Sequence, residues 1–273
     1  MGRAAVSSAA GLSAQGDALL ASRRTLPEEI PVAMVFDGAT LAVMMATPAD
    51  IADFALGFAL SEGVIETPAQ IAAFEIADHP QGIEARFWLS EDRAEALAAR
   101  RRFMAGPVGC GLCGIDSLEQ AARPLPVVAD SGLRFARADI LRATESLRAF
   151  QPLHDLTRAT HAAGFMRPGE GIMLAREDVG RHNALDKLIG ALAGAGIDPA
   201  TGAIVMTSRL STELVQKCAV AGCPVLVAVS APTAHAVRLA EDAGITLAAL
   251  VRSGGFDLYS HPHRILSEVP DVA

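Results

Sequence analysis

Short apolar segments alternate with helix-like segments through the second half of the chain, and this alternation limits the possible folds more than any other feature. The alternating segments cover residues 171–174, 182–189, 203–207, 212–221, 225–229, 233–243 and 246–251. Residues 203–206 and 225–229 are apolar without interruption, as strands buried on both faces should be. The sequence therefore predicts an α/β fold in which helices cover both faces of a layered sheet.

The first half of the chain predicts a smaller part that mixes strands and helices. Its expected elements are strands over 30–36 and 41–45, a helix ending at 61–63, a strand over 83–89 and a charged helix over 91–102. Asp37 and Gly38 supply the positive φ of a tight hairpin turn between the first two strands. Thr47 before Pro48 is the expected cap of the first helix.

Composition divides the chain into three predicted parts. Residues 1–25, mostly Ala, Ser and Gly without a processing site, are expected to be a disordered leader. An N-terminal α+β part over 26–123 and an α/β domain over 124–273 would follow. Their boundary falls on the Pro- and Gly-containing residues 124–134, which could equally be a long surface crossing within one domain.

Charge and hydropathy argue against general binding to nucleic acid or to a membrane, and since no secretion signal is recognised, the cytoplasm is the expected compartment. The 273 residues are 51% hydrophobic and 20% charged, which is a globular composition, and the net charge is −8. The longest apolar stretch, 218–231, is interrupted by Gly222 and Pro224 and falls short of the ~18 residues of a membrane helix.

Cys110 and Cys113 stand two residues apart in a segment with four glycines, which predicts a mobile loop at the end of the 26–123 part. Mobility is useful if a sulfur atom must visit two places, and the arginines at 100–102 would favour the thiolate. The alternative is two small residues in a turn, although Cys usually lies buried. We therefore take the pair as the candidate nucleophiles.

Three chemistries use such a cysteine pair. Zinc needs about four ligands, and Cys218 and Cys223 have the wrong spacing and fall on segments expected to be buried. A thioredoxin-type redox centre would lie at a strand-to-helix corner, which the flanking glycines do not resemble. In the third, sulfur carriage, a thiolate takes up a sulfane sulfur as a persulfide and passes it on.

Ionisable side chains are dense over residues 176–187, which include Asp178, Arg181 and His182. The alternative is a charged helix start with Asp178 as its cap. His161 could be an acid–base group, a metal ligand or a satisfied polar residue. Ala163 stands where a zinc deaminase has its general-acid Glu, so that chemistry fails, while a deaminase-like fold without it stays compatible.

Polar residues also follow three predicted strands of the second half. Ser208 and Arg209 follow one strand, Thr233 follows the next, and Arg252 leaves what we expect to be the final strand as a basic turn. The carboxyl ends of parallel strands share one edge of a sheet, where open α/β folds bind ligands, and helix N-termini favour phosphate. No P-loop or G-x-G-x-x-G fingerprint occurs at these turns.

Several blocks of the chain, in one order between about residues 30 and 263, together resemble the FdhD family of formate dehydrogenase accessory sulfurtransferases. The blocks lie at 54–58, 61–63, 110–114 (Cys-Gly-Leu-Cys-Gly), 160–163 (Thr-His-Ala-Ala), 177–187 (Glu-Asp-Val-Gly-Arg-His-Asn-Ala-Leu-Asp-Lys), 230–233 (Ser-Ala-Pro-Thr) and 259–262. Blocks in register are far more specific than a lone C-x-x-C.

The resemblance implies a cytidine-deaminase-like layered α/β sheet with a smaller N-terminal β-containing part, paired as a homodimer. It implies a cytoplasmic sulfur carrier that accepts sulfur from a cysteine desulfurase as a persulfide on Cys110 or Cys113. The carrier would transfer that sulfur to the bis-molybdopterin guanine dinucleotide molybdenum cofactor before the cofactor enters formate dehydrogenase.

The resemblance also implies that the 124–273 domain binds this cofactor through its GDP or GMP moiety, with no metal held by the protein itself. The implied cofactor-binding residues are Leu250, Val251, Arg252, Ser253, Gly254, Gly255, His161, Asp178, Arg181, His182, Ser208, Arg209 and Thr233. Better-known members can carry a basic residue where Gly255 stands, so Arg252 and backbone amides would have to compensate. A non-catalytic cofactor chaperone and a thiol-disulfide oxidoreductase are the alternative functions.

Overall fold

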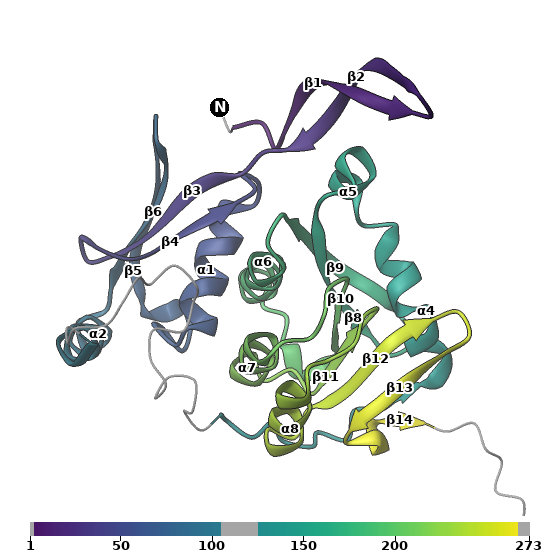
Figure 1. Ribbon diagram of the computed structural model, residues 1–273. Coiled ribbons are helices and arrows are strands. Elements are labelled where there is room, and N and C mark those ends of the chain that lie inside the picture. The colour runs from purple at the N-terminus through teal and green to yellow at the C-terminus, as the bar shows by residue number, and fades with distance from the viewer. Residues whose placement is uncertain (1–2, 105–124, 267–273) are drawn as a thin grey trace, which may run out of the picture.

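The computed structural model describes residues 3–104 and 125–266 of the chain. Two layered units lie side by side, and a narrow two-stranded hairpin projects from them (Figure 1). Among the described residues, no helix is both long enough and apolar enough to cross a membrane.

The smaller unit is built on a four-stranded sheet with the strand order β4-β3-β6-β5. Its elements are β3 (Ile30–Phe36), β4 (Ala39–Ala46), α1 (Ile51–Ser61), the 3-10 helix η1 (Pro68–Gln70), β5 (Ile71–His79), β6 (Gly82–Leu89) and α2 (Glu91–Met104). Asp37 and Gly38 form the predicted turn between β3 and β4 with positive φ values of 49° and 77°. The aromatic core of this unit contains Phe36, Phe54 and Phe87.

The start of α1 differs from the prediction. The helix begins at Ile51 with Asp50 as its N-cap in the left-handed region, at φ 53°, so the predicted cap at Thr47 is wrong. Thr47 is fully buried, and its hydroxyl accepts a hydrogen bond from the backbone N–H of Val179. The side chain that resembles a local cap is used instead to join the two units.

The larger unit is built on a six-stranded sheet with the order β13-β12-β11-β10-β8-β9. Its elements are β7 (Phe135–Ala136), α4 (Arg137–Arg148), α5 (Pro152–Thr157), β8 (His161–Arg167), β9 (Gly171–Asp178), α6 (Arg181–Gly194), η2 (Pro199–Thr201), β10 (Ala203–Met206), α7 (Thr212–Ala221), β11 (Val225–Ala228), α8 (Ala234–Asp242), β12 (Thr246–Arg252), β13 (Gly255–Ser260), η3 (Pro262–Arg264) and β14 (Ile265–Leu266). Strands β10, β11 and β12 run parallel, and β7 pairs with β14 in a separate small sheet.

Helices cover both faces of the six-stranded sheet, which confirms the predicted α/β class. On β10, Ile204 and Met206 pack with α6, α7 and α8, while Ala203 and Val205 pack with α4 on the opposite face. This alternation explains why the strand sequence is apolar without interruption. The expectation that β12 is the final strand is wrong, because β13 follows it as an antiparallel edge strand.

Helices α1 and α6 join the two units through direct backbone contact. A Cβ atom added to Gly57 would lie 1.7 Å from the carbonyl oxygen of Asp186, and one added to Gly190 would lie 1.9 Å from that of Asp53. Only glycine permits so close an approach.

The predicted division of the chain between residues 123 and 124 stays a prediction. The N–H of Val128 donates to the carbonyl of Ala243, which ties residue 128 to the larger unit.

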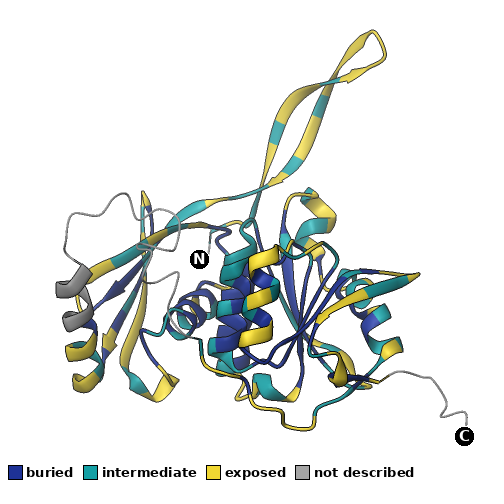
Figure 2. Cartoon of the chain, turned by 60° about the horizontal axis from the view of Figure 1, so that its bottom comes forward, coloured by how far each residue is buried: buried dark blue, intermediate teal, exposed yellow. Residues whose placement is uncertain are grey.

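The expectation of a disordered leader over residues 1–25 is wrong. Strands β1 (Val6–Gln15) and β2 (Ala18–Pro27) pair antiparallel as a hairpin that projects from the molecule (Figure 2). Gly16 has φ 57° and forms the two-residue turn with Asp17. A Gly at the first turn position is a strong hairpin signal, which the Ala- and Ser-rich composition of the flanking strands conceals.

Candidate functional site

One edge of the six-stranded sheet collects most of the predicted binding residues. The parallel strands β10, β11 and β12 end at this edge, and the antiparallel strand β8 begins there, since Ala163 pairs with Met206. His161 at the start of β8 pairs with Asp178 at the end of β9. We call this edge, with the loops that follow β9, β10, β11 and β12, the carboxyl edge.

Three helices begin at the carboxyl edge. Helices α6, α7 and α8 follow β9, β10 and β11, so their N-termini, which carry partial positive charge, point to the same side of the sheet. Thr233 caps α8 by accepting the N–H of Ala236 at 3.2 Å. The loops before α7 and α8 are tied together, because the N–H of Thr233 donates to the carbonyl of Leu210.

Asp178 lies at this edge but is fully buried, so its carboxylate does not face solvent. One oxygen accepts the N–H of Gly180 at 2.7 Å, and the other lies 2.7 Å from Nζ of Lys187, which is also fully buried. The backbone N–H of Thr47 and the amide of Asn183 complete its partners, at 3.0 and 2.9 Å. Asp178 therefore positions the start of α6 against β4 rather than presenting a group to a ligand.

Glu177, the residue before Asp178, holds the short helix α5. Its carboxylate accepts the backbone N–H groups of Leu153 and His154, both at 2.8 Å, and the hydroxyl of Thr160 at 3.1 Å. These bonds satisfy donors that the start of a helix leaves open. Both acidic residues, Glu177 and Asp178, therefore stabilise the fold.

Arg181 and the two histidines are partly exposed at the carboxyl edge. Burial and the neighbouring Arg181 guanidinium lower the pKa of His182 to about 4. Burial, the Arg181 guanidinium and His154 also lower the pKa of His161, although the Asp178 carboxylate favours the charged ring. Both rings are therefore neutral at pH 7, and Nε2 of His182 lies 3.4 Å from the hydroxyl of Ser211 before α7.

The remaining predicted residues divide into exposed and buried ones. Arg209 and Arg252 are exposed, whereas Ser208 is buried and donates its hydroxyl to the carbonyl of Arg209. Val251 is buried against the α4 side of the sheet. Leu250 has φ 56°, in the left-handed region that a branched side chain rarely adopts, and accompanies a break in the β12–β13 register.

A tight turn follows Leu250 and Val251. Arg252 pairs with Gly255, so Ser253 and Gly254 form a two-residue hairpin turn between β12 and β13. All of the residues over 252–254 are exposed. The basic turn expected at the end of β12 is thus a short hairpin at the carboxyl edge.

The cysteines that the sequence singles out cannot be placed beside this edge. Cys110 and Cys113 lie outside the described residues. Cys218 in α7 and Cys223 before β11 are fully buried, as predicted, and burial raises the pKa of Cys223 to about 12. These two thiols are therefore neutral and inaccessible at pH 7.

Sequence reasoning missed a second buried ion cluster beside the first. Lys217 of α7 lies 3.0 Å from Asp186 of α6 and 2.8 Å from Glu62, next to the hydroxyl of Ser61. Burial disfavours the charge of Lys217, but Asp186 and Glu62 outweigh it, and the pKa of Lys217 is raised. The sequence signal is weak, because Asp186 falls within the ionisable run over 176–187 and Lys217 is separated from it by some thirty residues.

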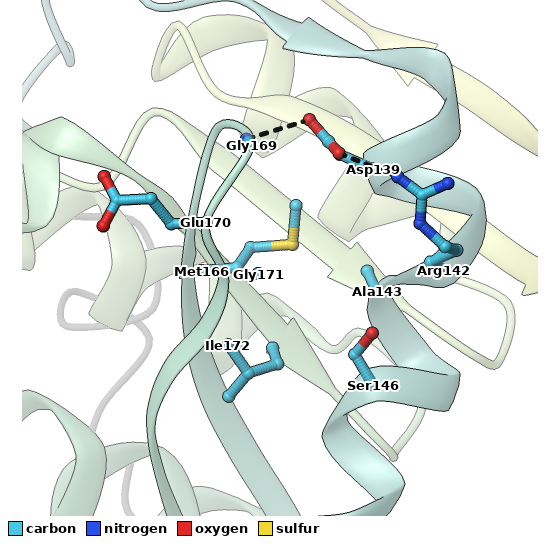
Figure 3. Close-up of a pocket in the computed structure, with 9 residues that line it drawn as sticks. All are labelled: Asp139, Arg142, Ala143, Ser146, Met166, Gly169, Glu170, Gly171 and Ile172. Atoms are coloured by element: carbon cyan, nitrogen blue, oxygen red, sulfur yellow. Dashed lines mark hydrogen bonds and ion pairs between the residues drawn. The ribbon is translucent and has the colours of Figure 1, made fainter.

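A separate pocket of about 220 Å³ lies at the opposite edge, between α4 and the β8–β9 turn (Figure 3). Asp139, one of its two acidic lining residues, already accepts the N–H of Gly169 at 3.2 Å and the guanidinium of Arg142 at 3.3 Å. None of the predicted site residues lines this pocket. It is therefore distinct from the carboxyl edge.

The fold and the carboxyl edge define a class of layered α/β protein that combines helix N-termini with basic side chains at one edge of its sheet. The family model described as "FdhD/NarQ family" matches residues 27–266. The chain belongs to the FdhD/NarQ family.

Similar proteins cover nearly the whole chain. A protein of Agrobacterium fabrum named sulfur carrier protein FdhD is 52% identical over 89% of this chain and 90% of its own. One of Brucella abortus with the same name is 54% identical over 90% of this chain and 91% of its own. The crystal structure of a putative formate dehydrogenase accessory protein from Desulfotalea psychrophila covers 96% of this chain and 100% of its own, with a TM-score of 0.74 and 23% identity. At that identity, the structural similarity supports the fold alone.

Proposed function

We propose that this chain is a sulfur carrier in the maturation of formate dehydrogenase. The names of its Agrobacterium and Brucella relatives support this role, as does the C-x-x-C pair of Cys110 and Cys113. The thiolate of one cysteine attacks the terminal sulfur of a cysteine desulfurase persulfide. The sulfur–sulfur bond of the desulfurase breaks, its cysteine leaves as a thiolate, and the carrier cysteine becomes the persulfide.

The proposed acceptor is the bis-molybdopterin guanine dinucleotide molybdenum cofactor, whose guanine nucleotide end binds at the carboxyl edge. One observation carries this assignment: the N-termini of α6, α7 and α8 lie at the same sheet edge as Arg181, Arg209 and Arg252, in a chain of net charge −8. Helix N-termini and arginines are the groups that bind phosphates. When bound, the cofactor supplies the molybdenum that accepts the sulfur.

An orphaned donor at the same edge fits a phosphate. The Nε atom of Arg181 is buried and has no hydrogen-bond partner among the described residues. Buried donors in folded proteins are nearly always paired, so an unpaired one marks a place where an acceptor belongs. Arg181 at the start of α6 would donate to a phosphate oxygen, and the neutral His182 would hydrogen-bond without adding charge.

Intact mass spectrometry tests the carrier step. The wild-type chain and the Cys110→Ala and Cys113→Ala variants are incubated with a cysteine desulfurase and cysteine, with and without a reductant. We expect a mass gain of one sulfur that the reductant removes and that one of the two variants loses. No gain with an active desulfurase would refute the carrier and favour a cofactor chaperone. An internal disulfide without sulfur gain would favour the oxidoreductase.

A further inference from the structure

Glu213 is an acidic side chain among the basic groups of the carboxyl edge. Of the three described helices that begin there, α7 carries Glu213 in its first turn, whereas the first turns of α6 and α8 contain no acid. The described loops before these helices, residues 179–180, 207–211 and 229–233, contain none either. Because Asp178 is buried, Glu213 is the only acid in these described loops and first turns that a ligand could reach.

Glu213 lies beside two of the residues proposed to bind the nucleotide. One of its carboxylate oxygens is 3.8 Å from Nε2 of His182, and its side chain is 34% exposed. Helix α7 lies next to α6 (Figure 1), and the charge of Arg181 at the start of α6 acts on the same carboxylate. Glu213 is therefore part of the proposed binding edge and is open to solvent.

The carboxylate of Glu213 is ionised and can accept further hydrogen bonds. Burial alone would raise the pKa of Glu213, but hydrogen bonds from Ser211 and from its own backbone N–H, together with the Arg181 charge, lower it below the ordinary value. A carboxylate has about four acceptor positions, so about two remain for a ligand.

The chemistry of a carboxylate limits which part of a nucleotide it can meet. A carboxylate repels phosphate, so its partner must be a group that donates hydrogen bonds. Guanine carries two adjacent donors, the N1–H and the amine on C2, which match the two oxygens of a carboxylate. Adenine has an acceptor at N1, hypoxanthine has the N1–H without the amine, and xanthine has a carbonyl oxygen in place of the amine.

We propose that Glu213 recognises the guanine base of the nucleotide at the carboxyl edge, with its carboxylate accepting the N1–H and the C2 amine. The inference rests on the proposed function and adds a specificity-determining residue outside the set that the family resemblance implies. The alternative is that Glu213 only stabilises the positive N-terminus of α7. That role would affect the stability of the chain and not its choice of base.

Isothermal titration calorimetry with GDP, inosine diphosphate and xanthosine diphosphate at fixed salt tests this proposal. We expect the wild type to bind GDP at least about tenfold more tightly than inosine diphosphate, which lacks the C2 amine. Glu213→Gln offers one acceptor and one donor, which suits xanthine, so this variant should bind xanthosine diphosphate about tenfold more tightly than GDP.

Two further variants show whether the carboxylate itself makes the choice. Glu213→Ala should bind GDP and inosine diphosphate within about threefold of each other and should not gain xanthosine diphosphate. Glu241→Gln is the matched control, because Glu241 is 60% exposed in the last turn of α8, away from the helix N-termini, and should keep the wild-type order. Thermal scans of all variants check that the chain remains folded.

The outcomes distinguish this inference from the proposed function. A wild type that binds none of the three nucleotides would refute the nucleotide site and the inference with it. A wild type that binds GDP and inosine diphosphate equally would overturn the role of Glu213 and leave the nucleotide site standing. A Glu213→Gln variant that is less stable but keeps the wild-type order would also overturn it, since Glu213 would then serve only α7.

Discussion

Replacing Asp178 by Asn should strongly destabilise the chain. The substitution keeps the shape of the side chain but removes the charge that lies 2.7 Å from Nζ of Lys187, and both residues are fully buried. Removing one partner of a buried ion pair costs about 3–5 kcal/mol, because the other charge remains in the interior. The N–H groups of Thr47 and Gly180 donate to different oxygens of Asp178, so the new amide places its NH2 group against one of these two donors.

Urea denaturation followed by circular dichroism measures this loss. A loss of about 3–5 kcal/mol is a large share of the ~5–15 kcal/mol by which most domains are stable, so the midpoint should move far to lower urea. Combining Asp178→Asn with Lys187→Met removes both charges and should recover much of the loss. Asp155→Asn is the matched control, since Asp155 is 58% exposed beside Arg148 and should cost less than about 1 kcal/mol.

Two results would refute this reasoning. A loss below about 1 kcal/mol for Asp178→Asn would mean that the Lys187 charge is not held in the interior by this carboxylate. A double variant no more stable than Asp178→Asn would mean that the uncompensated charge is not the source of the loss.

Two further predictions follow from the packing of α6 and from the pKa of His182. Gly57→Ala should lower the unfolding midpoint by an amount equivalent to at least about 2 kcal/mol, because its Cβ would lie 1.7 Å from the Asp186 carbonyl oxygen; Gly194→Ala, which meets nothing within 4 Å, should not lower it in the same thermal scan. The His182 pKa of about 4 lies below the ordinary histidine value of about 6.5, so the unfolded chain binds more protons between these values and stability falls as pH drops from 6.5 to 4. His182→Gln should flatten this part of a stability–pH curve, and an unchanged slope would contradict the assignment.

The sequence predicted the parts of the fold whose signal is local or periodic. Strands β10 and β11 were predicted because uninterrupted apolar runs have few other uses, and α7 was predicted with the bounds that the structure shows. The sharing of one edge by Ser208, Thr233 and Arg252 followed from the parallel direction of the strands that precede them.

Long-range partners explain what the sequence could not predict. Thr47 has the local pattern of a helix cap, but its partners are Asp178 and Val179, more than a hundred residues away. Asp178 and Ser208 were predicted to bind a ligand, yet both are buried, because residue type does not reveal burial. The β1–β2 hairpin was missed because its alternation of small residues is weak, and only the pairing register separates its two faces.

Binding of GDP, followed by isothermal titration calorimetry at fixed salt, tests most directly the central claim that the carboxyl edge binds the guanine nucleotide end of the cofactor. We predict that the wild type binds GDP and that Arg181→Gln and Arg252→Ala each weaken binding by about tenfold, the loss of one charge-assisted hydrogen bond. Arg142→Ala, whose side chain is 65% exposed at the opposite edge, should leave binding unchanged. No binding by the wild type, or binding that is lost only in Arg142→Ala, would contradict the claim.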